Sequence, residues 1–364
     1  MGARSYEEAG VRGQHEALSA VRRYLSPTFD YPDAEVLTSF GHYASVLKVS
    51  DDLALAICTD GVGSKTIVAS AVDRYDTVGI DCMAMNVNDL ICVGARPVAL
   101  VDYLGVHTLD EGRAAEILKG LGAAAAEAGV AVVGGEIAQL PEVIGSDGTV
   151  VGDERAFDLV GTCVGVLRPD ELILGEAVAA GDAVIGLASS GLHSNGYTLA
   201  RRVLLDEGGY GLDEHIGALG CTLGEELLRP TRIYVRAVVG LWEGGLETRG
   251  LAHITGDGVA NLCRLGPHAG FLLDGLPRAQ PIFGLIQETG GIGDAEMFRV
   301  FNMGIGFVVV VPGPQERAAL KSLAALGYDA MRIGSVTDQA GQVWIRPHGL
   351  VATLRDGEAV IEPG

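Results

Sequence analysis

The chain has 364 residues, of which 26 are basic and 47 are acidic, giving a formal net charge of −21. This balance argues against nucleic acid or an anionic membrane as a partner, because both bind to basic surfaces. No stretch approaches the roughly 18–20 apolar residues of a membrane span, and the first residues lack the apolar core of a signal peptide. The length suits two domains, each with enough material for a core.

Along the first half of the chain, helix-like and strand-like stretches alternate. A polar helix is expected over residues 5–25 and a loop over 26–40. The pattern then predicts strands at 53–58, 97–106, 130–133 and 157–167, with helices at 65–75, 81–93 and 110–128. Ser64 is a suitable N-cap for the helix at 65–75, and Gly94 would end the helix at 81–93.

Residues 170–181 look like a domain joint, so we expect one domain over 1–170 and a second over 171–364. In the second half the pattern predicts strands at 182–188, 306–311 and 331–336, and helices at 197–207, 227–242, 259–265 and 315–326. Strands that alternate with helices indicate an α/β class with mixed sheets.

Cysteines lie at positions 58, 82, 92, 163, 221 and 263, and no pair forms Cys-x-x-Cys. Their apolar surroundings are typical of buried free thiols in a reducing cytoplasm. Closely spaced Cys or His ligands, which a zinc site needs, are absent from the sequence.

Asp60 and Asp89 are the strongest candidates for chemistry. Asp60 follows an apolar run and opens the segment Thr59-Asp60-Gly61-Val62-Gly63-Ser64-Lys65, whose glycines allow backbone N–H groups to approach phosphate oxygens. This segment is not a P-loop, because the order of its parts differs. Two carboxylates together with substrate phosphates suffice for Mg²⁺, and Lys65 could contact those phosphates or face solvent. Alternatively, Asp60 is a solvated residue of a tight turn.

The helix at 81–93 strengthens the case for Asp89. Asp81, Met85 and Asp89 recur every four residues on a stripe that also carries apolar side chains. A carboxylate on an inward face is costly unless a cation, a metal or a donor compensates its charge. Asp102, within a strand, and Glu136, after Gly134-Gly135, are further acidic candidates for metal or nucleotide, or are structural acids.

Two loops in the second half are candidates for substrate contact. Ser189–Tyr197 is rich in Ser, Gly and Asn and opens a helix, so Ser190, His193, Asn195 and Gly196 could hold a phosphate. A plain loop with a helix cap fits the same composition. His253 precedes a glycine turn, where it could act as an acid or base or be structural.

Six segments occur in the same order as in phosphoribosylformylglycinamidine cyclo-ligases, and the chain resembles this family from about residue 5 to about residue 336. They are Ser5–Val11, Thr59–Lys65, Asn88-Asp89, Val133–Glu136, Ser189–Tyr197 and Ala252–Gly256. The resemblance implies ATP-dependent closure of formylglycinamidine ribonucleotide to aminoimidazole ribonucleotide in purine biosynthesis. It also implies a homodimer in which the N-terminal sheets combine.

Site roles follow from the resemblance in the same way. Asp60, Asp89 and Glu136 would bind Mg²⁺, with Gly61, Gly63, Lys65 and Asp102 on the nucleotide side. His253 would assist proton transfer beside Asp60 and Asp89, and Ser190, His193, Asn195 and Gly196 would hold the ribonucleotide.

The sequence departs from the family pattern in three places. The segment Phe40-Gly41-His42-Tyr43-Ala44 replaces a Gly-Gly-Phe-Gly-like segment and puts the adenine end of the site in doubt. Glu136 is followed by Ile137 and Gln139, where Thr and Glu are common, and Asp257 stands where Gly is frequent. The departures after Glu136 and at Asp257 could alter the metal geometry or could mark a divergent branch of the family.

Related functions are the alternatives. A thiamine-monophosphate kinase would use the same acidic nucleotide site but matches less well at His193 and at 5–11. A selenophosphate synthetase would need a reactive residue before Cys58, and a hydrogenase-maturation protein would end in Cys. A degenerate nucleotide-binding homologue would bind ATP without turnover.

Overall fold

The computed structural model of the chain describes residues 4–11, 15–31, 35–38, 40–145, 153–266, 268–355 and 357–364. In the first half the strands are β1 (Glu35–Val36), β2 (Ser45–Ser50), β3 (Leu53–Gly61), β4 (Arg96–Val106), β5 (Ala131–Gln139) and β6 (Phe157–Leu167). The helices there are α1 (His15–Leu25), α2 (Lys65–Val72), α3 (Asp76–Cys92) and α4 (Glu111–Ala128).

In the second half the strands are β7 (Ala183–Ala188), β8 (His215–Ile216), β9 (Cys221–Thr222), β10 (Gly250–His253), β11 (Gly270–Leu273), β12 (Ile305–Val311), β13 (Ala330–Thr337), β14 (Val343–Ile345), β15 (Leu350–Arg355) and β16 (Glu358–Pro363). The helices are α5 (Tyr197–Arg201), α6 (Leu223–Leu227), α7 (Val235–Glu243), α8 (Pro281–Gly290), α9 (Asp294–Val300) and α10 (Glu316–Ala325). A π-helix (Arg202–Glu207) continues α5, and a 3₁₀ helix covers Gly258–Arg264.

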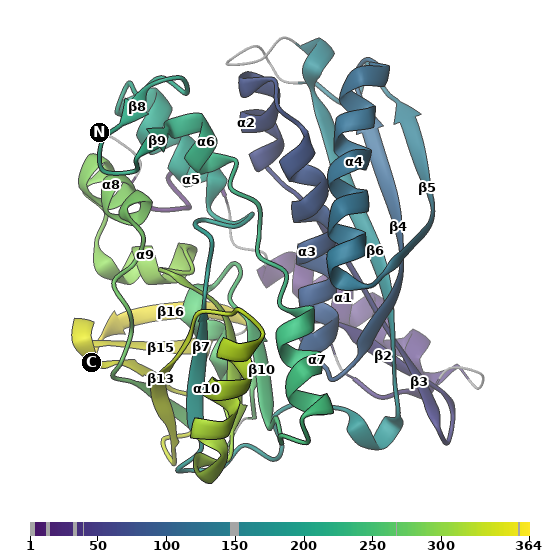
Figure 1. Ribbon diagram of the computed structural model, residues 1–364, viewed down its shortest axis with the longest axis vertical. Coiled ribbons are helices and arrows are strands. Elements are labelled where there is room, and N and C mark those ends of the chain that lie inside the picture. The colour runs from purple at the N-terminus through teal and green to yellow at the C-terminus, as the bar shows by residue number, and fades with distance from the viewer. Residues whose placement is uncertain are drawn as a thin grey trace.

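The first sheet has the order β1-β2-β3-β6-β4-β5, with β4 and β5 parallel and the other pairs antiparallel. Strand β6 alternates buried and partly exposed residues, so one of its faces packs on a core. Helices α3 and α4 lie side by side over that face (Figure 1). Their backbones touch where Gly79 and Gly120 lie, because a Cβ on Gly120 would be 1.7 Å from the carbonyl oxygen of Asp76.

The opposite face of the first sheet carries exposed apolar side chains. Val101 and Tyr103 of β4 lie on this face and are 41% and 39% exposed, and Val98 and Val133, at irregularities of the strand pairing, are 41% and 65% exposed. Large apolar side chains gathered on one sheet face indicate a surface that another molecule covers.

The second sheet has the order β10-β12-β7-β13-β11-β14-β15-β16 and mixes parallel and antiparallel pairs. Every residue of β12 is buried, as expected for a run of the composition Ile-Gly-Phe-Val-Val-Val-Val that is covered on both faces. One face packs towards α10 and α3, and the other towards the 3₁₀ helix at 258–264. The expected α/β class with mixed sheets is confirmed.

Several expected boundaries are wrong for local reasons. Strand β3 runs on to Gly61 and β5 to Gln139, so Asp60 and Glu136 lie within strands and not in turns after them. The helix expected at 227–242 is divided into α6 and α7, since Pro230 cannot continue a helix. The helix expected at 5–25 begins at His15, after a turn at 5–10.

Helix α3 lies between the first sheet and the second half of the chain (Figure 1), where it contacts β10 and α7. We propose that the two sheets form two domains with a boundary at residues 170–171, between β6 and β7. Among the described residues, the structure contains no helix that is long and apolar enough to span a membrane.

Candidate active site

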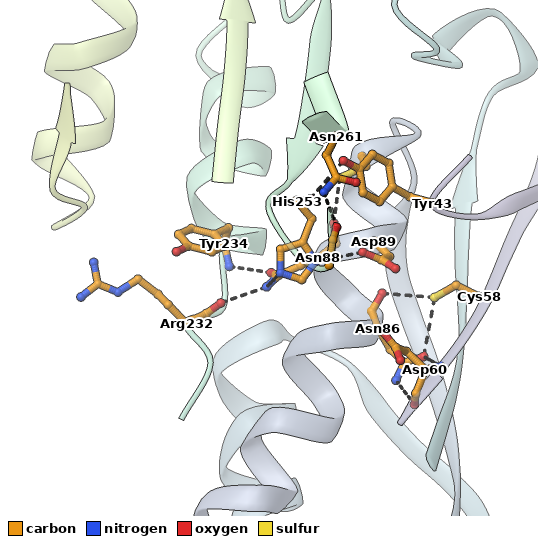
Figure 2. A network of polar contacts seen from close by, with 12 residues as sticks. Tyr43, Cys58, Asp60, Asn86, Asn88, Asp89, Arg232, Tyr234, His253 and Asn261 are labelled. Atoms are coloured by element: carbon orange, nitrogen blue, oxygen red, sulfur yellow. Dashed lines mark hydrogen bonds and ion pairs between the residues drawn. The ribbon is translucent and has the colours of Figure 1, made fainter. Parts of the chain in front are cut away.

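Asp60 lies at the end of β3, on the sheet face that packs against α3. The side chain of Asn86 from α3 binds the backbone of Asp60 in both directions, accepting from its N–H at 3.1 Å and donating to its carbonyl oxygen at 3.1 Å. Figure 2 shows Asn86 between α3 and the end of this strand. Gly161 on β6, which pairs with Asp60, makes room for Asn86, since a Cβ there would lie 2.7 Å from the Asn86 amide nitrogen.

Asp89 is held from the second domain by His253. The imidazole Nδ1 of His253 donates to Asp89 Oδ1 at 2.9 Å, and Nε2 lies 3.5 Å from the amide nitrogen of Asn88. His253 is 0% exposed, and the hydroxyl of Tyr43 donates to its carbonyl oxygen at 3.0 Å. Figure 2 shows His253 between Asn88 and Asp89. This contact makes His253 an orienting group for Asp89, and its role in proton transfer stays a prediction.

The carboxylates of Asp60 and Asp89 repel each other. Burial, and after it the charge of Asp89, raise the pKa of Asp60 to about 6. Two partly buried like charges without a cation between them favour a divalent ion, so the donor set fits Mg²⁺. Among the described residues no three His, Cys, Asp or Glu side chains gather closely enough to hold a metal ion, so substrate phosphates would have to supply further ligands.

Asp102 and Glu136 lie on opposite faces of the first sheet. Asp60, Gly161 and Asp102 occupy one row across β3, β6 and β4, so Asp102 is on the same face as Asp60 but two strands away, about 10 Å. Burial raises the pKa of Asp102. Glu136 pairs with Tyr103 and is exposed on the other face. Within one chain, therefore, Glu136 does not join Asp60 and Asp89, contrary to the expected set of three metal ligands.

The glycine turn after β3 is placed as expected, but Lys65 is not. Gly63 has φ +69°, a left-handed conformation that favours glycine, and Gly61 ends the strand. Lys65 is 0% exposed, and its ammonium contacts Asp81 at 2.7 Å as well as two backbone carbonyl oxygens. No N–H of this ammonium remains for a phosphate, so the expected nucleotide contact by Lys65 is wrong in this arrangement.

The polar groups of the loop at 189–196 are bonded partly within the loop and largely to neighbouring segments. The Ser190 hydroxyl donates to the carbonyl oxygen of Pro230 at 2.6 Å, and the Ser190 N–H donates to His193 Nε2 at 3.2 Å. Burial holds the pKa of His193 well below its usual range, so the ring is neutral. Ser190 and His193 thus shape the loop. Asn195 retains a buried amide nitrogen without a partner, and Gly196 precedes α5 with φ +78°.

Two of the departures from the family pattern meet beside His253. Asp257 has φ +70°, which explains why glycine suits this position, and its carboxylate accepts from Arg264 at 3.3 Å. Arg264 also donates to the carbonyl oxygen of Gly41 at 3.1 Å and lies over the ring of Tyr43. The segment Phe40–Ala44 is thereby attached to the segment that follows His253.

Three residues of the site were not predicted from the sequence. Asn86 and Asn88 fasten α3 to β3 and to the second domain, and Tyr43 supports His253. The sequence does give a signal for the first two, because buried amides in an apolar helix require partners. No comparable signal marks Tyr43.

Comparisons with known proteins agree over most of the chain. The family described as AIR synthase related protein, N-terminal domain, matches residues 41–167, and the corresponding C-terminal domain matches 179–345. A phosphoribosylformylglycinamidine cyclo-ligase of Methanothermobacter thermautotrophicus is 48% identical over 342 residues, which cover 93% of this chain and 96% of the relative.

Solved structures share the fold at lower identity. The crystal structure of tt0281 from Thermus thermophilus superposes with a TM-score of 0.61 at 21% identity, covering 91% of this chain and 96% of that one. A thiamine-monophosphate kinase from Stenotrophomonas maltophilia K279a gives 0.59 at 20% identity, covering 90% and 95%. On the strength of the domain matches and the 48% identity, the chain belongs to the phosphoribosylformylglycinamidine cyclo-ligase family.

Proposed function

We propose that this chain is an ATP-dependent ligase that closes formylglycinamidine ribonucleotide to 5-aminoimidazole ribonucleotide in purine biosynthesis, releasing ADP and phosphate. Family membership supports the reaction. The repulsion between the carboxylates of Asp60 and Asp89, which contributes to the raised pKa of Asp60, is the observation that supports placing the chemistry there. The free thiols of the six cysteines support a cytoplasmic location.

The reaction needs an amide oxygen to become a leaving group. That oxygen takes the γ-phosphoryl group from ATP as ADP departs. The amidine nitrogen of the same molecule then attacks the activated carbon, the C–O bond breaks, and phosphate leaves while the nitrogen loses a proton. Because the attack is intramolecular, the protein has mainly to align the groups and neutralise charge.

Each group of site residues has its own role in the proposed reaction. Asp60 and Asp89 would hold Mg²⁺, which when bound would neutralise the charge of the triphosphate. His253 keeps Asp89 oriented through the 2.9 Å hydrogen bond. The N–H of Gly61 donates to Asp60 Oδ1 at 2.7 Å and that of Val62 to the carbonyl oxygen of Leu159, so phosphate oxygens would approach the turn from Gly63 onward. The loop that contains Ser190, His193, Asn195 and Gly196 closes the ribonucleotide side, where the unpartnered amide of Asn195 is the best direct donor.

A coupled assay tests the function. The protein is incubated with Mg-ATP and formylglycinamidine ribonucleotide, and aminoimidazole is followed by diazo coupling alongside phosphate. Equal and substrate-dependent appearance of both is the expected result. ATP consumption without aminoimidazole would instead indicate a kinase, and ATP binding without turnover would indicate a degenerate homologue.

Replacing His253 by Ala is expected to lower turnover about 10–100-fold and to raise the Mg²⁺ concentration needed for half activity. The reason is that Asp89 loses the donor that orients it. The pH profile of kcat should keep its shape. Loss of one limb of that profile would show that His253 itself transfers protons, contrary to its burial. Ala at the exposed His215 is the control and should change nothing.

We also propose that the enzyme is a homodimer formed through the open face of the first sheet. The exposed apolar residues of β4 and β5 support this assembly, because such a face is costly to leave in water. The same interface would bring Glu136, which lies on that face, towards the partner chain.

Replacing Val101 by Lys is expected to convert the dimer into monomers at micromolar concentration, measured by light scattering. A charge buried at the centre of an apolar interface has no partner there. Leu118→Lys on α4 is the matched control and should leave the dimer intact. Leu118 is 43% exposed, compared with 41% for Val101, but lies on a helix away from this face. A monomeric wild-type protein would contradict the proposed assembly.

A further inference from the structure

Helix α3 holds a segment of the second domain by two polar side chains. Asp81 and Asn88 are seven residues apart and therefore lie on one helix face. Asp81 Oδ1 accepts from the N–H of Thr231 at 2.7 Å and from its hydroxyl at 2.6 Å. Asn88 donates to the carbonyl oxygen of Arg232 at 2.9 Å and accepts from the N–H of Tyr234 at 2.9 Å. The segment 231–234 is thus fixed by its backbone.

Lys65 connects this contact to the loop at 190–196. Its ammonium lies 2.7 Å from Asp81 Oδ2 and donates to the carbonyl oxygens of His193 at 3.0 Å and Arg229 at 2.6 Å. The side chains of Lys65 and Asp81 are both 0% exposed. One buried cation therefore joins α2, α3, the loop and the segment after α6.

Stability alone is a poor explanation for this pair. A buried ion pair can often be replaced by apolar residues of similar volume without loss of stability, whereas removal of one partner is costly. What an apolar pair cannot reproduce is the directed contact with the carbonyl oxygen of His193. Lys65 also follows Asp60 by five residues, across the turn at Gly63.

We propose that Lys65 and Asp81 are positioning residues that fix the loop at 190–196 relative to Asp60 and Asp89. This inference rests on the proposed function, in which the loop holds the ribonucleotide and the carboxylates hold the Mg-nucleotide. The phosphoryl group can pass between them only if the two substrates are correctly spaced, and a displacement of about 1 Å can cost 100-fold in rate.

The test compares Lys65→Met, Asp81→Leu and the double variant Lys65→Met/Asp81→Leu. Each single variant should unfold at lower denaturant concentration, because a buried charge loses its partner. The double variant should be less destabilised than the sum of the two single variants, because neither charge is left unpaired, and it should not regain activity. It should remain less stable than the wild type, since the donors of Thr231 and the carbonyl oxygens of His193 and Arg229 still lose their partners. Its KM for the ribonucleotide should rise about 10-fold or more and its kcat should fall, while its KM for ATP stays close to that of the wild type.

Arg96→Gln/Glu243→Gln is the matched control, since it removes an exposed ion pair between β4 and α7 of the same two domains. It should leave both KM values unchanged. A double Lys65/Asp81 variant as active as a functioning wild type would overturn the inference and leave the function intact. A wild type that forms no aminoimidazole would overturn the function and the inference with it.

Thr231→Val replaces the double variant if that variant does not fold. It removes the hydrogen bond of the Thr231 hydroxyl to Asp81 and its 3.1 Å contact with Ser194 of the loop, while keeping the shape of the side chain. A rise of about 3-fold or more in the KM for the ribonucleotide is expected, and an unchanged KM would overturn the inference.

Discussion

Replacing Asp60 by Asn is expected to lower turnover by about 10³-fold and to stabilise the fold at neutral pH. Turnover falls because a neutral amide cannot help to hold the cation on the triphosphate, whose charge stabilisation is worth several kcal/mol. Stability rises because Asn removes a charge that burial and Asp89 both disfavour. The free energy of unfolding should increase by about 1–3 kcal/mol at pH 8, allowing for solvent screening.

The sign of the pH dependence follows from the raised pKa of Asp60. The folded state, with a pKa of about 6, binds the proton more tightly than the unfolded chain, whose ordinary value is 3.8. The folded state is therefore favoured below pH 4, and this advantage is lost as pH rises through 6. The stability difference between Asp60→Asn and wild type should be small at pH 4 and should reach its full size above pH 7.

Urea unfolding at a series of pH values, without added Mg²⁺, measures this difference. Asn at the exposed Asp30 is the control and should shift neither stability nor turnover. A fully active Asp60→Asn enzyme would remove Asp60 from the metal site. An inactive variant without any pH-dependent gain in stability would show that burial and Asp89 do not disfavour the charged form of Asp60.

Replacing Gly120 by Ala is expected to destabilise the fold by about 3 kcal/mol and to reduce turnover with it. The added Cβ would lie 1.7 Å from the carbonyl oxygen of Asp76, a backbone atom that cannot rotate away. Helices α3 and α4 must then separate, and such overpacking typically costs 1–3 kcal/mol, occasionally more, so about 3 is expected here. Because α3 carries Asp89, its displacement also disturbs the carboxylate pair.

Gly122 on the same helix provides a matched control. An added Cβ there meets nothing within 4 Å, so Gly122→Ala should stabilise the protein by about 0.5–1 kcal/mol through helix propensity. Thermal and urea unfolding of Gly120→Ala and Gly122→Ala measure whether steric crowding or helix propensity determines the change in stability at each position. Equal behaviour of both variants would contradict the close contact of α3 with α4.

The class of fold and the main strands could be predicted because their signals are local. The run at 157–167 alternates and the run at 306–311 is continuously apolar, and both are strands with nearly the expected ends. Asp60 and Asp89 could be proposed from the sequence because Asp60 follows an apolar run before a glycine turn and Asp89 lies on an apolar stripe of a helix. The partners of the buried polar side chains could not be predicted, because they come from distant segments of the chain and no period or spacing in the sequence indicates them.

Lys65 shows where sequence reasoning fails. A lysine after a glycine turn suits a phosphate equally well in an exposed or a buried position, and only the placement of Asp81 and His193 decides. The position of Glu136 was predicted incorrectly for another reason. Gly134 and Gly135 suggest a turn, but the chain continues there as strand β5. Within a strand, successive side chains point to opposite faces, so the pairing register decides on which face Glu136 lies.

The contacts made by α3 have a consequence for synthesis on the ribosome. Asp81 and its partner Thr231 are separated by 150 residues, so at about 5–20 residues per second the partner emerges roughly 8–30 s after the helix. Until residues 193 and 229 have been made, the ammonium of Lys65 has no carbonyl oxygen of His193 or Arg229 to bind. The N-terminal half of a nascent chain should therefore wait in an unfinished, water-accessible state, and the active site can form only when about two-thirds of the chain has been made.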